Sequence, residues 1–90
     1  MVEQITFVKV TLDLGKAIRR IREKKCLSQG DIFRRSGLER TYISRIEQGL
    51  IEDPRISTTV ILARALGVTI DELVSEAERA AEEKGAAEAE

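Results

Sequence analysis

Hydrophobic residues recur at helical spacing along most of the chain. Between residues 14 and 25 they fall three or four positions apart, at Leu14, Ala17, Ile18 and Ile21. This spacing places them on one face of an amphipathic helix. Comparable patterns predict helices at about 29–35, 40–48 and 57–66, and a fifth helix after Thr69. The pattern therefore predicts an all-α fold of five helices.

Polar residues and glycines mark the ends of these helices. Side chains suited to accept a hydrogen bond from the first helical turn precede four of the segments: Asp13, Ser28, Ser57 and Thr69. Glu72, three residues after Thr69, completes a capping box, and Asp31 stands at the equivalent place after Ser28. Gly37 and Gly67 are suited to end the second and fourth helices in a left-handed conformation.

Residues 29–48 have the pattern of a helix-turn-helix motif. Two short helical segments are joined by a tight turn at Ser36-Gly37-Leu38. The second segment has apolar residues at Ile43 and Ile46, with polar residues between them. Its polar side is therefore expected to face solvent or a ligand.

The two ends of the chain depart from this pattern. Residues 4–11 alternate between apolar and polar types and are rich in β-branched residues, which predicts a strand or arm within residues 1–13. A lone strand needs a partner, so this segment pairs with its copy in a second subunit, or else it is a flexible arm. Such an arm would lie on the helical domain, residues 14–74, or remain disordered. Residues 75–90 form an acidic Ala/Glu tail, predicted to be helical to about residue 84 and then frayed.

Charge is divided unevenly along the 90 residues, although the net charge is only −1. Residues 14–45 hold ten basic and three acidic side chains, a net charge of +7, whereas residues 71–90 hold two basic and eight acidic ones, a net charge of −6. A basic block that carries a helix-turn-helix indicates contact with phosphate, although a solvated charged surface is the alternative reading. The acidic tail is expected to point away from DNA.

Several classes of function are disfavoured. No apolar run approaches the roughly 18 residues of a membrane span, and no signal peptide is recognisable, so we expect a cytoplasmic, nucleoid-associated protein without a membrane partner. With one cysteine and no histidine we expect no metal and no cofactor. There is no nucleophile with a paired base and no Gly-rich phosphate loop, so we do not expect an enzyme.

Three short sequences in the motif resemble the phage repressor/Cro type of helix-turn-helix, also called the xenobiotic-response-element (XRE) type. They are Ser28-Gln29, Ser36-Gly37-Leu38 and the run YISRIEQG at residues 42–49. The resemblance extends over about residues 14–74. It implies a five-helix lambda-repressor-like DNA-binding domain, in which helix 40–48 enters the major groove of DNA.

The resemblance also implies roles for individual residues. Those expected to contact base edges are Arg40, Thr41, Ser44 and Arg45, although either arginine can instead contact phosphate alone. Those expected to contact phosphate are Gln29, Tyr42 and Arg55, with core filling as the alternative for Tyr42. Arg22 and Glu47 are expected to form a structural ion pair that links the first helix to the recognition helix.

At several positions the sequence departs from this family. Cys26 ends the first helix where glycine is usual, which predicts a modestly strained left-handed residue. Phe33 replaces a common alanine, so its ring must turn outward or shift the helix crossing. In the loop after Gly49, acidic Glu52-Asp53 stand where relatives are often basic. Leu50-Ile51 are expected either to form an exposed apolar patch or to pack beneath the loop.

These features predict a sequence-specific transcriptional regulator, most simply a repressor. It would bind double-stranded DNA at a palindromic operator as a homodimer, because one copy of the motif contacts few base pairs and a core of this size is marginal. One alternative is the DNA-binding antitoxin of a toxin–antitoxin pair, with a partner protein bound at the acidic tail or at Leu50-Ile51. A protein-interaction module of the same fold is the other.

Overall fold

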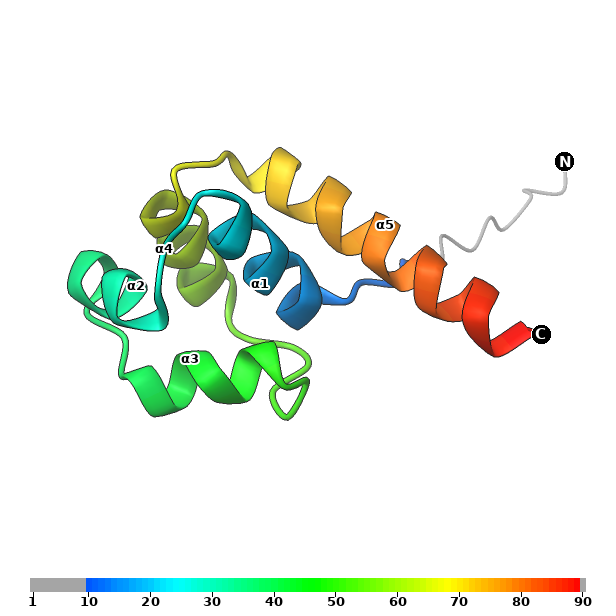
Figure 1. The fold of residues 1–90 in the computed structure, drawn as a ribbon, viewed down its shortest axis with the longest axis horizontal. Coiled ribbons are helices and arrows are strands. Elements are labelled where there is room, and N and C mark those ends of the chain that lie inside the picture. Colours follow the sequence, from blue (N-terminus) through cyan, green and yellow to red (C-terminus); the bar gives the residue numbers. More distant parts are fainter. Residues whose placement is uncertain (1–9, 90) are drawn as a thin grey trace, which may run out of the picture.

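Helix α1 (Leu14–Lys24) lies at the centre of the fold, with α3 on one side and α5 on the other (Figure 1). The computed structural model describes residues 10–89, and in this range the chain forms five helices and no strand. The remaining helices are α2 (Gln29–Ser36), α3 (Arg40–Glu47), α4 (Ile56–Leu66) and α5 (Ile70–Ala89). The predicted all-α, five-helix fold is confirmed for this part of the chain.

All five helices contribute to one hydrophobic core. Its largest fully buried side chains are Ile18, Ile32, Ile43, Ile46, Leu62, Leu66 and Leu73. Burying each such aliphatic side chain contributes about 1.5–3 kcal/mol to folding. Because α3 supplies two of them, the core holds the predicted recognition helix directly against the rest of the domain.

Three of the predicted helix caps are present. The Asp13 carboxylate accepts the backbone N–H of Lys16 at 3.2 Å. Ser28 and Asp31 form a complete capping box, because each side chain accepts the backbone N–H of the other residue, at 3.0 and 2.7 Å. Thr69 and Glu72 do the same before α5, both at 3.1 Å. These local hydrogen bonds explain why the sequence predicted the starts of α1, α2 and α5.

The predicted N-cap at Ser57 is wrong. Helix α4 begins one residue earlier, at Ile56, and its N-cap is Arg55, whose side chain makes no capping bond. The Arg55 carbonyl accepts both the backbone N–H of Thr59, at 3.0 Å, and the Thr59 hydroxyl, at 3.1 Å. These bonds close the first helical turn around Ser57, which therefore lies inside the helix.

Cys26 adopts the left-handed conformation that the sequence predicted, with a φ of 58°. A residue with a Cβ in this region destabilises the fold by about 1–2 kcal/mol. Glycine avoids this strain, but it loses more conformational entropy on folding, which offsets part of the gain. We therefore expect Cys26→Gly to raise the free energy of unfolding by about 0.5–1 kcal/mol. Thermal denaturation followed by circular dichroism measures this, and a lower melting temperature would contradict the strain at Cys26.

The N-terminal segment is anchored on α5. Residues 10–13 form neither helix nor strand, and the backbone N–H of Asp13 donates to the carbonyl of Ala77 at 3.0 Å. The strand predicted at residues 4–11 falls almost entirely on residues 1–9, outside the described range. Pairing of this segment across a dimer therefore stays a prediction.

Helix α5 packs along α1 more closely than the alanine-rich sequence suggested. Ala77 and Ala80 are fully buried, and small side chains at these positions let the two helices approach. Glu83 pairs with Lys16 and Arg20 of α1, and Arg20 also contacts Glu76. The helix continues through Gly85, where the sequence predicted fraying, to Ala89. No helix in the described range is long and apolar enough to cross a membrane.

Hydrogen bonds to carboxylates make the stability of the fold depend on pH. The backbone N–H of Ser28 lowers the pKa of Asp31 below its ordinary 3.8, and the backbone N–H of Thr69 lowers the pKa of Glu72 below 4.5. Hydrogen bonding to Arg20 lowers the pKa of Glu83 in the same way. A carboxylate whose pKa is lower in the folded than in the unfolded chain stabilises the fold at pH values above its unfolded pKa. That stabilisation is lost as the pH falls through the pKa of the folded state.

We therefore expect the melting temperature to fall as the pH is lowered from about 5 to about 3. Thermal melts in a series of buffers of equal ionic strength test this. The double variant Asp31→Asn, Glu72→Gln removes two of the titrating groups and should show a shallower fall. A melting temperature that is constant or rises over this range would contradict the assignment.

Candidate nucleic-acid interface

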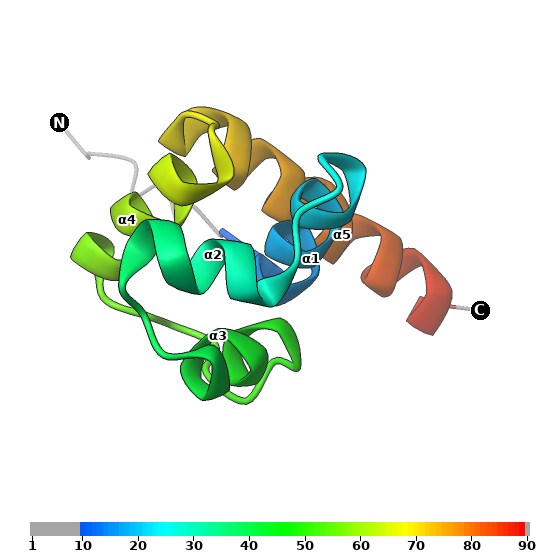
Figure 2. The ribbon, with the colours of Figure 1, turned by 60° about the vertical axis from the view of Figure 1, so that its left-hand side comes forward.

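Helices α2 and α3 form a helix-turn-helix, with α3 crossing beneath α2 on one side of the molecule (Figure 2). The turn between them begins at Gly37, which is left-handed with a φ of 76° and whose N–H donates to the Phe33 carbonyl at 2.8 Å. The Ser36 hydroxyl accepts the N–H of Leu38 at 3.0 Å. These bonds fix the turn and so set the angle at which α3 leaves α2.

The backbone of α3 lies directly against α1 at Gly15. An ideal Cβ added to Gly15 would stand 2.1 Å from the carbonyl oxygen of Ile46 and 3.0 Å from that of Glu47. Real Cβ atoms do not approach backbone oxygens so closely. Only glycine therefore permits this contact, which holds the C-terminal end of α3 in place. The sequence showed Gly15 but did not show this role.

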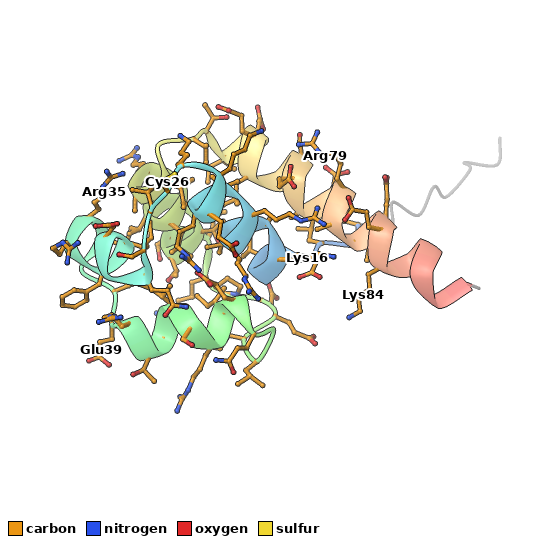
Figure 3. All side chains as sticks on the ribbon, in the orientation of Figure 1. Lys16, Cys26, Arg35, Glu39, Arg79 and Lys84 are labelled. Carbon is orange, nitrogen blue, oxygen red and sulfur yellow. The ribbon has the colours of Figure 1, made fainter. Side chains whose placement is uncertain are left out.

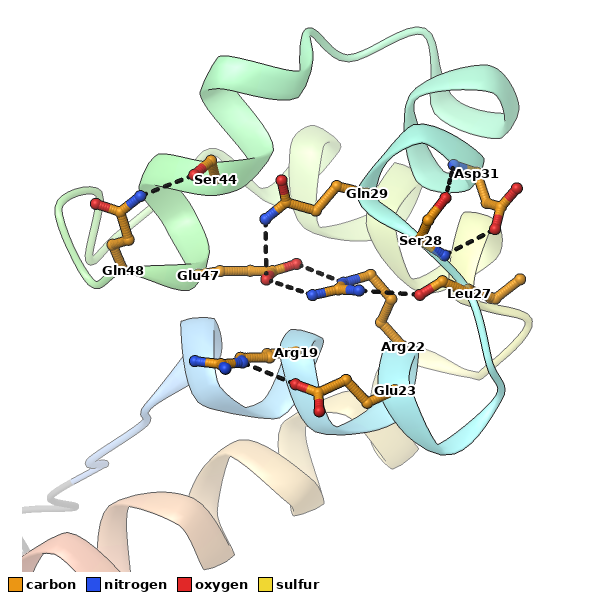
Figure 4. Close-up of polar contacts among 10 residues, drawn as sticks. All are labelled: Arg19, Arg22, Glu23, Leu27, Ser28, Gln29, Asp31, Ser44, Glu47 and Gln48. Atoms are coloured by element: carbon orange, nitrogen blue, oxygen red, sulfur yellow. Dashed lines mark hydrogen bonds and ion pairs between the residues drawn. The ribbon is translucent and has the colours of Figure 1, made fainter.

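A bidentate ion pair joins α1 to α3, as predicted. The Arg22 guanidinium donates through Nε to Glu47 Oε2 and through Nη2 to Glu47 Oε1, both at 2.9 Å (Figure 4). Its Nη1 donates to the Leu27 carbonyl at 2.9 Å. The two side chains are only 14% and 5% exposed. The hydrogen bonds to Glu47 raise the pKa of Arg22 above its ordinary value, so the guanidinium stays charged at physiological pH.

Gln29 extends this network from α2. Its Nε2 donates to Glu47 Oε1 at 3.2 Å, so Glu47 receives donors from two other helices (Figure 4). The side chain is half-buried and turned toward α3. The expected phosphate contact of Gln29 stays a prediction, and the described structure shows its side chain fixing the relative positions of α2 and α3.

The four predicted base readers all lie on α3, but they do not point the same way. Arg40, Thr41 and Arg45 are exposed and Ser44 is half-exposed. The guanidinium carbon of Arg40 lies 4.0 Å from the point where a Cβ on Gly30 would stand, so this side chain rests against α2. The Ser44 hydroxyl accepts a hydrogen bond from Gln48 at 2.8 Å. Gln48 was not among the predicted readers.

The other two predicted phosphate-contacting residues, Tyr42 and Arg55, lie on α3 and directly before α4. The Tyr42 ring is half-buried and packs against the core, which agrees with core filling, the alternative role of this residue. Arg55 is exposed and lies beyond the loop after α3, directly before α4. The phosphate contacts of both residues stay predictions.

Most of the basic block at residues 14–45 is already paired within the protein. Five of its side chains pair with carboxylates: Lys16, Arg19, Arg20, Arg22 and Arg34. Two more donate to carbonyls at the C-terminal end of α4, Arg35 to Ala65 at 3.1 Å and Lys25 to Gly67 at 3.0 Å. Among the described residues, this leaves Lys24, Arg40 and Arg45 without such a partner. Two of these three lie on α3.

The departures from the family pattern have simple structural outcomes. The Phe33 side chain turns outward and is 42% exposed, so the helices keep their close approach. Leu50 is 69% exposed, whereas its neighbour Ile51 packs against the core beneath the loop. Glu52 and Asp53 are both exposed just beyond α3.

Comparison with known proteins agrees with this geometry. A protein-family profile described as helix-turn-helix matches residues 18–73, more than half of the chain. The chain belongs to the helix-turn-helix family. The match spans α2, α3 and α4 completely, and it confirms the resemblance carried by the motif at residues 29–48.

Two curated proteins are similar to this chain over more than two thirds of its length. This helix-turn-helix protein is 39% identical over 62 residues to the uncharacterized HTH-type transcriptional regulator y4dJ of Sinorhizobium fredii, covering 69% of this chain and 79% of that protein. It is 34% identical over 71 residues to the control protein C.SmaI of Serratia marcescens, covering 79% of this chain and 83% of the relative.

Two crystal structures share the fold. The restriction-modification controller protein C.AhdI from Aeromonas hydrophila superposes with a TM-score of 0.63 at 32% identity, over 69% of this chain and 92% of C.AhdI. The hypothetical transcription factor NHTF from Neisseria gives a TM-score of 0.64 at 30% identity, over 82% of this chain and 84% of NHTF.

Proposed function

We propose that this helix-turn-helix protein is a sequence-specific, DNA-binding transcriptional regulator that inserts α3 into the major groove. One observation carries the proposal. Of the ten basic residues in the block at 14–45, those on α3, Arg40 and Arg45, have no protein partner among the described residues. Most of the others neutralise carboxylates or cap α4. Within this block, the positive charge that is free to meet DNA thus lies mainly on the recognition helix.

Base reading is assigned to the outer side of α3. Arg45 and Arg40 each have the planar guanidinium that pairs with the O6 and N7 atoms of guanine, worth about 1–3 kcal/mol of discrimination. Thr41 offers a methyl group to thymine, and Ser44 completes the set. Phosphate contacts are assigned to Gln29 at the start of α2, Tyr42 on α3 and Arg55 directly before α4.

We propose that two copies bind together on a palindromic operator. One α3 spans only a few base pairs, so specificity requires a second half-site about one helical turn away, roughly 34 Å. Leu50 and Ile56, 69% and 74% exposed, stand at the two ends of the loop that follows α3 and offer apolar surface to a second copy. Leu50→Lys with Ile56→Lys should then give a monomer in light scattering. If deletion of residues 1–9 gives the monomer instead, the N-terminal segment forms the interface.

The relatives favour one setting for this regulator. C.SmaI is named a control protein, and C.AhdI a restriction-modification controller. We propose that this chain likewise controls, most simply represses, genes that lie next to its own gene. Adjacent reading frames for a methyltransferase and an endonuclease would support this, whereas an adjacent toxin frame would favour the antitoxin alternative.

Selection of bound DNA from a random pool tests the proposal. The full chain should enrich a consensus made of two half-sites related by two-fold symmetry and spaced by about one helical turn. The variant Arg45→Ala should lose the preference at one position of each half-site. Recovery of unrelated sequences by the wild-type chain, at stated salt concentration, would contradict it.

A further inference from the structure

The outermost stripe of α3 includes a residue beyond the four assigned readers. Ile43 and Ile46 are fully buried, so they define the inner side of the helix. Successive residues turn by about 100°, which places Thr41 and Gln48 most nearly opposite them, with Ser44 and Arg45 to either side. Gln48 keeps helical backbone angles, with φ −81° and ψ −4°, so the same turn applies to it. Gln48 is also exposed.

The Gln48 amide is held in a defined orientation. Its Nε2 donates to Ser44 Oγ at 2.8 Å, one helical turn earlier, on the side of α3 away from the Arg22–Glu47 pair (Figure 4). An amide carries two N–H donors and one carbonyl acceptor. The bond to Ser44 engages one donor, and among the described residues the second N–H and Oε1 have no protein partner. Ser44 thus orients the Gln48 amide.

We infer that Gln48 is a further specificity-determining residue, which reads an adenine in the major groove, and that Ser44 is its positioning residue. The inference rests on the proposed function. A neighbouring acceptor and donor on one amide match the N6 amino group and N7 of adenine, the bidentate pairing that glutamine makes. Arg40 differs, because it stands at the first position of α3 and its guanidinium carbon lies close to Gly30 of α2.

Selection from a random DNA pool with the full chain and three variants tests the inference. Wild type should enrich adenine at one position of each half-site. Gln48→Ala should reduce that preference about tenfold at this position only, because one bidentate pair is lost. Gln48→Glu should change the preferred base to cytosine, whose N4 amino group a carboxylate accepts. Ser44→Ala should weaken the adenine preference. In a chain that already carries Gln48→Ala, Ser44→Ala should cause no further loss of that preference.

Glu52→Ala is the matched control, since Glu52 is exposed four residues further on. It should leave every position of the consensus unchanged, and melting curves should be alike for all variants. An unchanged consensus with Gln48→Ala overturns the inference, and so does a uniform loss of affinity on all sequences, which would assign Gln48 to phosphate. If wild type enriches no consensus, the proposed function itself fails. A wild-type consensus that Gln48 variants leave intact overturns the Gln48 assignment alone.

Discussion

An Arg22→Ala variant is expected to unfold with a free energy about 3 kcal/mol below that of the wild-type chain. The substitution removes two hydrogen bonds to Glu47 and one to the Leu27 carbonyl, all at 2.9 Å. Glu47, only 5% exposed, would then keep Gln29 as its one remaining donor among those described. An uncompensated carboxylate between α1 and α3 is costly because little water reaches it. Urea denaturation measures the loss.

Arg19→Ala provides the matched control in the same helix. Arg19 pairs with Glu23, but the two side chains are 65% and 57% exposed. Exposed pairs of this spacing contribute about 0.3–0.5 kcal/mol, so the control should unfold almost as the wild type does. Loss of DNA affinity by Arg22→Ala at full stability would contradict the structural assignment and would make Arg22 a DNA contact.

Gly15→Ala is expected to cause the second large loss in the free energy of unfolding. Its Cβ would lie 2.1 Å from the Ile46 carbonyl oxygen, and the obstructing atom belongs to the backbone, which cannot rotate away as a side chain can. Forcing α1 and α3 apart should lower the free energy of unfolding by about 3 kcal/mol, at the upper end of the usual overpacking range. Since α3 must move, DNA affinity should fall further than stability alone explains.

Gly85→Ala makes the same chemical change with the opposite expected sign. Gly85 lies in α5, is exposed, and has no atom within 4 Å of the added Cβ. Alanine favours a helix over glycine by up to about 1 kcal/mol, less near a helix end, so this variant should be slightly more stable. If Gly15→Ala proved as stable as wild type, the close contact of α1 with α3 would be refuted.

The sequence predicted the features that depend on neighbouring residues. Helical spacing located the five helices, and side chains three residues apart located the capping boxes at Ser28 and Thr69. The family resemblance supplied the Arg22–Glu47 pair, which the structure confirms. Each of these is local or is carried by a motif of fixed spacing.

Features that depend on distant residues could not be predicted in this way. The basic block at residues 14–45 indicated contact with phosphate, yet Lys16 and Arg20 pair with α5, and Arg35 donates to a carbonyl of α4. The packing of α4 and α5 therefore decides, together with pairs inside α1 and α2 and with Glu47 of α3, which cations stay free. The Ser57 cap failed for a local reason instead, because the backbone N–H and the hydroxyl of Thr59 both donate to the Arg55 carbonyl and the helix starts one residue earlier.

We propose that the outer side of α3 reads DNA sequence. The ratio of the affinities for a selected site and for a scrambled site tests this proposal most directly. At one fixed salt concentration the wild type should prefer the selected site by about 10³-fold or more. Arg45→Ala should reduce this ratio at least about tenfold. Arg79→Ala, a charge-matched change on α5 on the far side of α1 from α3, should leave it unchanged (Figure 3). Equal wild-type affinity for both DNAs, or an equal effect of the two variants, would contradict the claim.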